Sequence, residues 1–390
     1  MATGFALCLA MLASPYLRGD PGLLGPEAAR YPESVQVAAS QIIAAPGDQE
    51  TAMQAARLFI NTGRKIGDAG LVQSGLSALQ PALQSQPDAR AMILAAVGKQ
   101  YLHDFDGALE LLDQAETLQP RNPTLLLTRA NILVVQGHTL KARPDCRGLA
   151  KSGAFDLALI CAATTDMLSP RADAAYAKLD RYMALKPKME PALRGYAHSV
   201  LAEIAMYQDW PDLAAGHFVQ AVEADPDSIR SAALYADFLL RRSEFEGALD
   251  ALRGKPPTDA ILVRTAIACS RLKKAGCLLR SRRSLQAHLL AEKKIGSFAH
   301  AREEARYLLD VEGKPAEALE RALLNWTLQR EFEDADILLR AARGADDIAA
   351  EQMVKSWVAE NGLSIPALAV ELGSHPQADA EIMPGRGSAL

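Results

Sequence analysis

Hydrophobic positions along most of the chain recur every three or four residues, which is the spacing of one face of an α-helix. In the segment 89–122, for example, the sequence MILAAVGKQYLHDFDGALELLDQAETLQP contains two such amphipathic stretches, separated by polar residues around 103–106. No segment shows the alternation of β-branched and polar residues that is typical of strands. The pattern therefore predicts helical hairpins and an all-α fold.

Prolines mark the ends of these hairpins. Pro87, Pro120, Pro187 and Pro226 each follow one helical stretch and precede another, at separations of 33, 67 and 39 residues. Proline ends a helix because it has no backbone N–H to donate. The separations are close to one, two and slightly more than one unit of about 34 residues, so the chain is predicted to be built from repeats.

Small residues recur at fixed positions within this unit. Counted from residue 89, positions 8, 20, 27 and 32 hold Ala96, Ala108, Ala115 and Pro120, and counted from residue 195 they hold Ala202, Ala214, Ala221 and Pro226. Small side chains at helix contacts allow the helices to approach closely. The arrangement resembles the tetratricopeptide repeat. This resemblance implies a right-handed α-solenoid of antiparallel helix pairs.

Weaker copies of the unit extend the resemblance over residues 48–360. They contain the small-residue pairs Gly63 and Ala82, Ala130 and Ala142, Ala163 and Ala175, and Ala236 and Ala248. Two further hairpins are predicted, one turning at Gly313 and Pro315 and one over 332–362. Stacking buries the apolar face that a lone hairpin would expose, so we expect about eight or nine hairpins in one array.

The two ends of the chain differ from the array. The apolar run at 5–12 is followed by Ala13, Ser14 and Pro15, as in a signal peptide, although residues 1–4 contain no Lys or Arg. Residues 1–16 are therefore predicted to be a signal peptide, which implies an extracytoplasmic protein, or else a cap helix in a cytoplasmic one. We expect residues 17–47 to form a leader with a Gly/Pro-rich stretch and a short helix, and 361–390 a terminal helix and a mobile tail.

No other stretch is long and apolar enough to span a membrane, so no transmembrane segment is expected in the mature chain. Beyond the predicted signal peptide the chain has four cysteines, Cys146, Cys161, Cys269 and Cys277, without a CxxC motif or zinc spacing. The simpler interpretation is that they are buried, unpaired small side chains. Their even number would also suit disulfides in an oxidising compartment.

Composition and motifs point away from catalysis. The hydrophobic content of 49% excludes wholesale disorder, and the net charge of −5 argues against a chain committed throughout to nucleic acid. No HExxH, GxSxG, GxxxxGK[ST] or strand-linked GxGxxG motif is present. His300 and Glu304 lie one helical turn apart, but two ligands do not make a metal site. The carboxylate pairs Asp104/Asp106 and Asp346/Asp347 lie in predicted turns, where Asp accepts backbone hydrogen bonds. We therefore expect no enzyme activity, metal or cofactor.

The resemblance also implies a binding surface. In tetratricopeptide arrays, inward-facing positions of each first helix line a concave groove, and here they include Arg90, Tyr101, Asn131, Tyr196, Glu203 and Tyr207. This mixture of aromatic and polar groups suits an extended peptide or a helix. Asn131 matches the Asn of a two-carboxylate clamp known in the family, but Leu127 stands where that clamp has Lys. The expected function is a non-catalytic scaffold for a protein or peptide partner, whose identity stays open.

Two other functions remain open. The segment 264–306 holds eleven Lys or Arg against three acidic residues, and it could bind an anionic surface or nucleic acid, with Arg280, Arg282 and Arg283 as contacts. Nucleic acid is unlikely on this pattern because the charges are not interleaved with a series of aromatic residues. The same charges could equally form a solvated helix surface. The other alternative is a helical domain of an enzyme that has no recognisable active site.

Overall fold

The computed structural model describes residues 23–45, 47–84, 87–295 and 300–369. These residues contain twenty α-helices and no strand. Hairpins pair α2 (Gln49–Ile66) with α3 (Ala69–Gln84), α4 (Ala89–Tyr101) with α5 (Phe105–Leu118), α6 (Pro123–Val135) with α7 (Thr139–Lys151), α8 (Phe155–Asp166) with α9 (Ala172–Ala184), and α10 (Pro191–Tyr207) with α11 (Pro211–Ala224).

The next hairpins pair α12 (Ile229–Arg241) with α13 (Phe245–Ala251), α14 (Asp259–Arg271) with α15 (Ala275–Ile295), α16 (Ala301–Tyr307) with α17 (Pro315–Trp326), and α18 (Phe332–Gly344) with α19 (Ile348–Glu360). The π-helix η3 (Leu308–Glu312) extends α16. The 3-10 helix η2 (Gly25–Arg30) and α1 (Glu33–Ala44) precede the array, and α20 (Pro366–Ala369) follows it. The described residues thus form nine hairpins, and the prediction of an all-α solenoid of tetratricopeptide-like helix pairs is confirmed.

Local sequence signals explain where these helices begin and end. Several first helices begin at a side-chain cap: Asp88 accepts a hydrogen bond from the amide of Arg90 at 2.8 Å, and Asn122 accepts one from Thr124 at 3.0 Å. Pro87, Pro120, Pro187 and Pro226 lie two or three residues beyond the ends of α3, α5, α9 and α11. The predicted role of these prolines is confirmed.

The turns inside the hairpins share one backbone feature. Eight of the nine described hairpins turn on a residue with φ between +56° and +80°; these are Gly67, His103, Gly137, Asp209, Ser243, Lys273, Gly313 and Asp346. The left-handed conformation reverses the chain within two or three residues. The hairpin of α8 and α9 is the exception, because residues 167–171 form a longer turn without such a residue.

The small residues lie where the helices approach most closely. Ala108, Ala115, Ala214 and Ala221 are fully buried, as the repeat pattern predicts. At Gly75, an added Cβ would lie 2.7 Å from Cγ1 of Ile60, which is closer than packed atoms can come. The helix contacts within these repeats therefore leave no room for a larger side chain.

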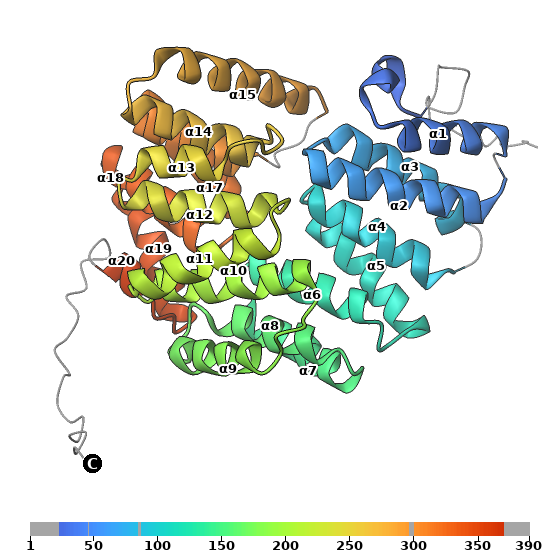
Figure 1. Ribbon diagram of the computed structural model, residues 1–390, viewed down its shortest axis with the longest axis horizontal. Helices are drawn as coiled ribbons and strands as arrows, with labels where there is room; N and C mark the ends of the chain where they lie inside the picture. Colours follow the sequence, from blue (N-terminus) through green and yellow to red (C-terminus); the bar gives the residue numbers. More distant parts are fainter. Residues whose placement is uncertain (1–22, 46, 85–86, 296–299, 370–390) are drawn as a thin grey trace, which may run out of the picture.

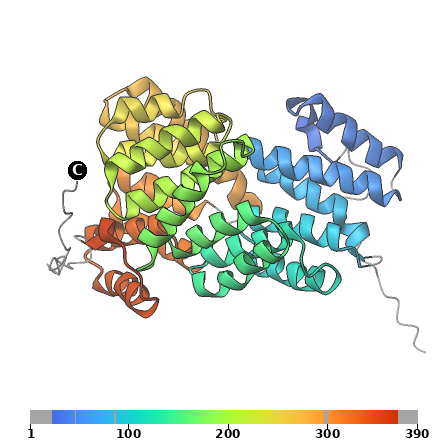
Figure 2. The same cartoon turned by 60° about the horizontal axis from the view of Figure 1, so that its bottom comes forward.

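The path of the array bends back on itself. Figure 1 shows α2–α5 as one arm and α10–α15 as a second, with α6–α9 between them. After α15 the chain returns: α16 and η3 contact α14, α20 contacts α10, and ion pairs join α12 to α16 and α18. Figure 2 shows this orange and red part from another side. The loop before α18 also reaches the end of α6, because the amide of Arg330 donates to the carbonyl of Val135 at 2.8 Å. The last hairpins therefore cover much of the inner side of the array.

The predicted signal peptide or cap helix at 1–16 and the tail beyond 369 lie outside the described residues. Within them, no helix is both long and apolar enough to cross a membrane.

Candidate partner-binding surfaces

The six predicted groove residues differ in accessibility. Arg90 is exposed, with 56% of its side chain accessible, and Tyr101, Asn131 and Tyr196 are half-buried. Glu203 and Tyr207 are buried, with only 5% and 4% exposed. The structure therefore leaves the predicted positions on α4 and α6 available and encloses two of the three on α10.

The chain itself covers Glu203 and Tyr207. The ring of Tyr207 stacks on that of Phe332 in α18 with 4.2 Å between centroids. Its hydroxyl donates to Glu203 at 3.3 Å, and Glu203 also accepts from Arg230 at 2.5 Å. Burial raises the pKa of both Glu203 and Tyr207. The expectation that these two residues face a partner does not fit this arrangement, because α18 already occupies their surroundings.

A buried ion cluster holds the returning helices in place. Asp237 in α12 faces Arg264 in α14 at 2.5 Å and Arg306 in α16 at 2.6 Å, and both arginines lie 3.3 Å from Glu333 in α18. Burial raises the pKa of Asp237, whereas Arg306 and Arg264 outweigh the burial of Glu333 and lower its pKa. Since two guanidiniums face two carboxylates, we take both carboxylates as ionised.

This cluster changes the interpretation of the basic segment 264–306. The side chains of Arg264, Arg302 and Arg306 are only 7%, 19% and 11% exposed, and they pair with acids of α12 and α18 or of the loop before α18. Three of the eleven positive charges therefore point into the molecule and are not part of a basic surface. Arg280, Arg282 and Arg283 do lie exposed on α15, where Arg282 is 3.4 Å from Glu312.

The candidate metal and carboxylate pairs have other partners. His300 lies 2.6 Å from Asp259, which also faces His288 at 2.5 Å, and Glu304 lies 4.0 Å from Arg321. Burial opposes ionisation of Asp259, but the two imidazoles outweigh it and hold its pKa at about 2. Asp104 and Asp347 accept backbone hydrogen bonds at the starts of α5 and α19. No group of three His, Cys, Asp or Glu among the described residues is arranged to hold a metal ion.

A buried histidine pair was not predicted from the sequence. The Nδ1 atoms of His198 in α10 and His217 in α11 are 3.1 Å apart, and the hydroxyl of Tyr176 lies 2.9 Å from Nε2 of His217. Burial, and then the neighbouring His217, lower the pKa of His198 to about 4. The pair links α9, α10 and α11 while it is neutral.

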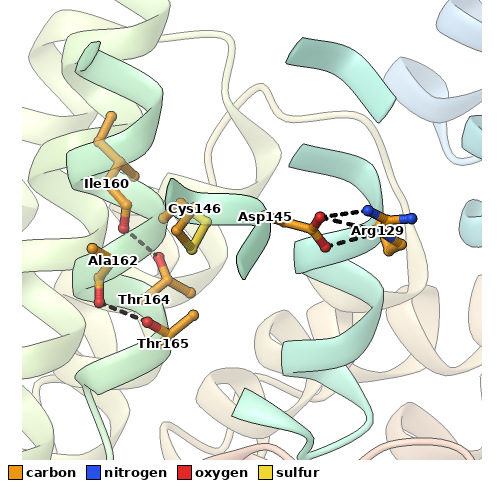
Figure 3. The surroundings of a disulfide bond; sticks show 8 residues. Arg129, Asp145, Cys146, Ile160, Ala162, Thr164 and Thr165 are labelled. Carbon is orange, nitrogen blue, oxygen red and sulfur yellow. Dashed lines mark hydrogen bonds and ion pairs between the residues drawn. A yellow bond between two sulfur atoms is a disulfide. The ribbon is translucent and has the colours of Figure 1, made fainter. Parts of the chain in front are cut away.

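The four cysteines form two disulfides, which corrects the interpretation that they are unpaired. Cys146 in α7 bonds to Cys161 in α8, and Cys269 in α14 bonds to Cys277 in α15. The Cα atoms of each pair are 5.4 and 5.9 Å apart, within the usual range. Figure 3 shows the surroundings of the first bond, where Asp145 points from α7 toward Arg129, away from the sulfur atoms.

Comparison with known proteins gives matches among solved structures. No protein-family model and no curated protein matches the chain. Among solved structures, it is similar to the tetratricopeptide domain of P58(IPK), with 16% identity, a TM-score of 0.25 and coverage of 75% of this chain and 99% of that one. It is also similar to yeast Tom70, with 13% identity, a TM-score of 0.26 and coverage of 82% and 96%. The fold assignment rests on the hairpins described above.

Proposed function

We propose that the chain is a non-catalytic scaffold that binds a protein or peptide partner on the inward-facing side of α4 and α6. We call the residues Arg90, Val97, Tyr101, Leu127 and Asn131 the N-terminal inner face. All five are exposed or half-buried. This accessibility is the observation that carries the proposal, because the matching positions Glu203 and Tyr207 on α10 are covered.

The chemistry of the N-terminal inner face suits a polypeptide. Val97 and Leu127 offer apolar contact, Tyr101 offers an aromatic anchor, and Arg90 and Asn131 can orient backbone or carboxylate groups. Arg90 already pairs with Asp88 at 3.0 Å and Glu50 at 3.6 Å, which holds its guanidinium at the end of α4. An extended segment or a helix of the partner fits such a surface.

The buried charged groups support a structural role rather than a catalytic one. Asp237, Glu333 and Asp259 each face two cationic or imidazole groups, which come from other helices or, for His300, from the residue before α16. Their charges are therefore satisfied by contacts that join helices. A catalytic role would need such groups to converge on an opening that can take a substrate.

We also propose that the mature chain acts outside the cytoplasm. Two disulfides support this, because disulfides persist mainly in oxidising compartments. Protein purified from its native host should begin after a cut between Ala10 and Tyr16. Recovery of cytosolic protein that still carries Met1 or Ala2 would contradict the proposal.

The binding proposal can be tested with the natural partner. The partner is captured from the native host on the tagged chain, identified by mass spectrometry, purified, and titrated by calorimetry. Tyr101→Ala and Asn131→Ala should each raise Kd about 5- to 150-fold, which corresponds to about 1–3 kcal/mol, while Tm stays unchanged.

Charge reversal on α15 separates this proposal from its alternative. Arg282→Glu combined with Arg283→Glu should leave Kd unchanged, because neither residue belongs to the N-terminal inner face. If this variant abolishes binding and Tyr101→Ala has no effect, the partner is an anionic surface and the inner-face proposal fails.

A further inference from the structure

A cleft of about 630 Å³ lies between α7, α8 and α9, apart from the N-terminal inner face. Helices α7 and α9 form its walls and α8 its floor. Its size falls in the range of about 300–1,000 Å³ that is usual for ligand-binding sites.

The cleft opens because α9 packs loosely on α8. Ala108, Ala214 and Ala248, the small residues at position 20 of their repeats, are fully buried, whereas Ala175 at the same position is only half-buried. This hairpin is also the one with the longer turn at 167–171, without a left-handed residue among those described. The irregular turn and the loose contact therefore occur in the same repeat.

The wall formed by α7 is fixed from two sides. Cys146 lines the cleft and is bonded to Cys161 in α8, and in Figure 3 the neighbouring Asp145 points the other way. Asp145 accepts hydrogen bonds from Arg129 in α6 at 2.7 and 3.0 Å, and Arg129 also binds Glu116 at 2.6 Å. A site on a wall held in this way is largely formed before a ligand arrives.

Cations stand in rows on both walls. Arg143 and Arg147 lie one turn apart on α7, Lys178 lies on α9 one turn before Tyr182, and Lys186 lies two residues beyond the end of α9. At 1.5 Å per residue, Arg143 and Arg147 are separated by about 6 Å along α7, and Lys178 and Tyr182 by about 6 Å along α9. This is the length of about two residues of an extended peptide.

Two of these cations, Arg147 and Lys178, form no ion pair within 4 Å among the described residues, although the charge of Lys178 acts on Asp166. Arg143 is 2.5 Å from Asp166, and Lys186 is 3.0 Å from Asp156. Arg147 and Lys178 are exposed, and no carboxylate of the described residues lies within 4 Å of either charge. The rim of the cleft therefore carries a positive excess in a chain whose net charge is −5.

The floor between the rows is apolar. Ala158, Leu159 and Ala162 of α8 form it, and Phe155 stands at one end with 60% of its surface exposed. A free phosphate, or a peptide with acidic side chains alone, would leave the apolar floor of the cleft exposed to water. A ligand with both carboxylates and a large apolar side chain would use the rim and the floor together.

We propose that this cleft binds an acidic segment of a partner protein, with an apolar side chain over Ala158, Leu159 and Ala162 and carboxylates paired with Arg147 and Lys178. The site is a second interaction surface, distinct from the N-terminal inner face. Its residues are not shared with that face, so each surface can fail its test while the other passes.

The test uses a fluorescein-labelled peptide of glutamate and leucine at helical spacing, titrated with the full chain in low salt by fluorescence polarisation. Arg147→Glu combined with Lys178→Glu should weaken binding about tenfold or more. Arg282→Glu with Arg283→Glu is the matched control, because it reverses two exposed charges on α15. It should change Kd by less than about twofold, as should Tyr101→Ala.

Several results would overturn the proposal. Equal weakening by both charge-reversal pairs would mean non-specific attraction. A peptide with serine in place of leucine should bind about tenfold more weakly, and equal affinity would show that the floor is not used. Binding to phosphatidylglycerol vesicles that depends on Arg147 and Lys178, without binding to the peptide, would mean that the cleft recognises lipid. Unchanged circular dichroism and Tm of the Arg147 and Lys178 variant would exclude misfolding as the cause of a loss.

Discussion

The buried ion cluster predicts a large loss of stability when Asp237 is replaced by alanine. The Asp237 side chain is fully buried, and it faces Arg264 and Arg306 at 2.5 and 2.6 Å. Without it, Arg264 keeps only Glu333 at 3.3 Å, and Arg306 keeps Glu333 at 3.3 Å and Asp310 at 3.6 Å, so both buried guanidiniums lose their shortest ion pair. Breaking a buried pair in this way costs about 3–5 kcal/mol. The expected change is a decrease of that size in the free energy of unfolding.

Urea unfolding followed by two signals can measure this loss and locate it. Circular dichroism reports on all helices. Tryptophan fluorescence reports mainly on the last hairpins, because two of the three tryptophans, Trp326 in α17 and Trp357 in α19, pack edge to face with 5.3 Å between their ring centroids. Because the cluster joins α12 and α14 to α16 and α18, the variant should lose tryptophan fluorescence at lower urea than it loses helicity. In the unmodified chain the two transitions should lie closer together.

An exposed ion pair provides the control. Lys65 and Asp227 are 3.1 Å apart, with 66% and 80% of their side chains exposed. Asp227→Ala should therefore cost no more than about 1 kcal/mol. If Asp237→Ala costs as little as Asp227→Ala, the ion cluster does not hold the returning helices and the reasoning is refuted.

Three further predictions concern packing, pH and redox state. Ala214 is fully buried between helices, so Ala214→Leu should cost about 1–3 kcal/mol in urea unfolding, and an unchanged midpoint would show that the assigned repeat register is wrong. Burial lowers the pKa of His198 to about 4, below its unfolded value of about 6.5, so the unfolded chain takes up the proton first. Stability should then fall by up to about 3 kcal/mol as pH drops from about 6.5 to 4, and a melting curve of His198→Phe that keeps this acid dependence would contradict the assignment. Reducing Cys146–Cys161, whose cysteines are 15 residues apart, should lower the free energy of unfolding by about 3 kcal/mol, and identical unfolding with and without dithiothreitol would argue against the bond.

The regular part of the fold could be predicted because its signals are local. Ala214, Ala221 and Pro226 lie within one repeat, and close helix contact and helix termination each depend on neighbours a few residues away. The same locality explains why Asp104 and Asp347 could be recognised as turn residues. Each of these features can be predicted without knowing how the whole array curves.

The covered part of the inner side could not be predicted, because it depends on contacts between distant repeats. Nothing near Tyr207 indicates that Phe332 will stack on it, more than a hundred residues later in the chain. The number of charges in 264–306 does not show which side chains point toward the core. Arg264 and Arg306 therefore cannot be told apart by sequence from the exposed arginines of this segment, although both point inward.

The sequence contains a partial indication of the cleft between α7 and α9. The spacings of Arg143 and Arg147, and of Lys178 and Tyr182, place each pair on one face of its helix. Which way those faces point depends on the irregular turn at 167–171, and the sequence of a single repeat does not determine that turn.

Hydrogen–deuterium exchange of the chain with and without its captured partner would test the central claim most directly. If the N-terminal inner face binds the partner, amides of 89–101 and 123–135 should exchange more slowly in the complex, while those of 275–290 on α15 should not change. Protection confined to 275–290, with none on α4 or α6, would contradict the account.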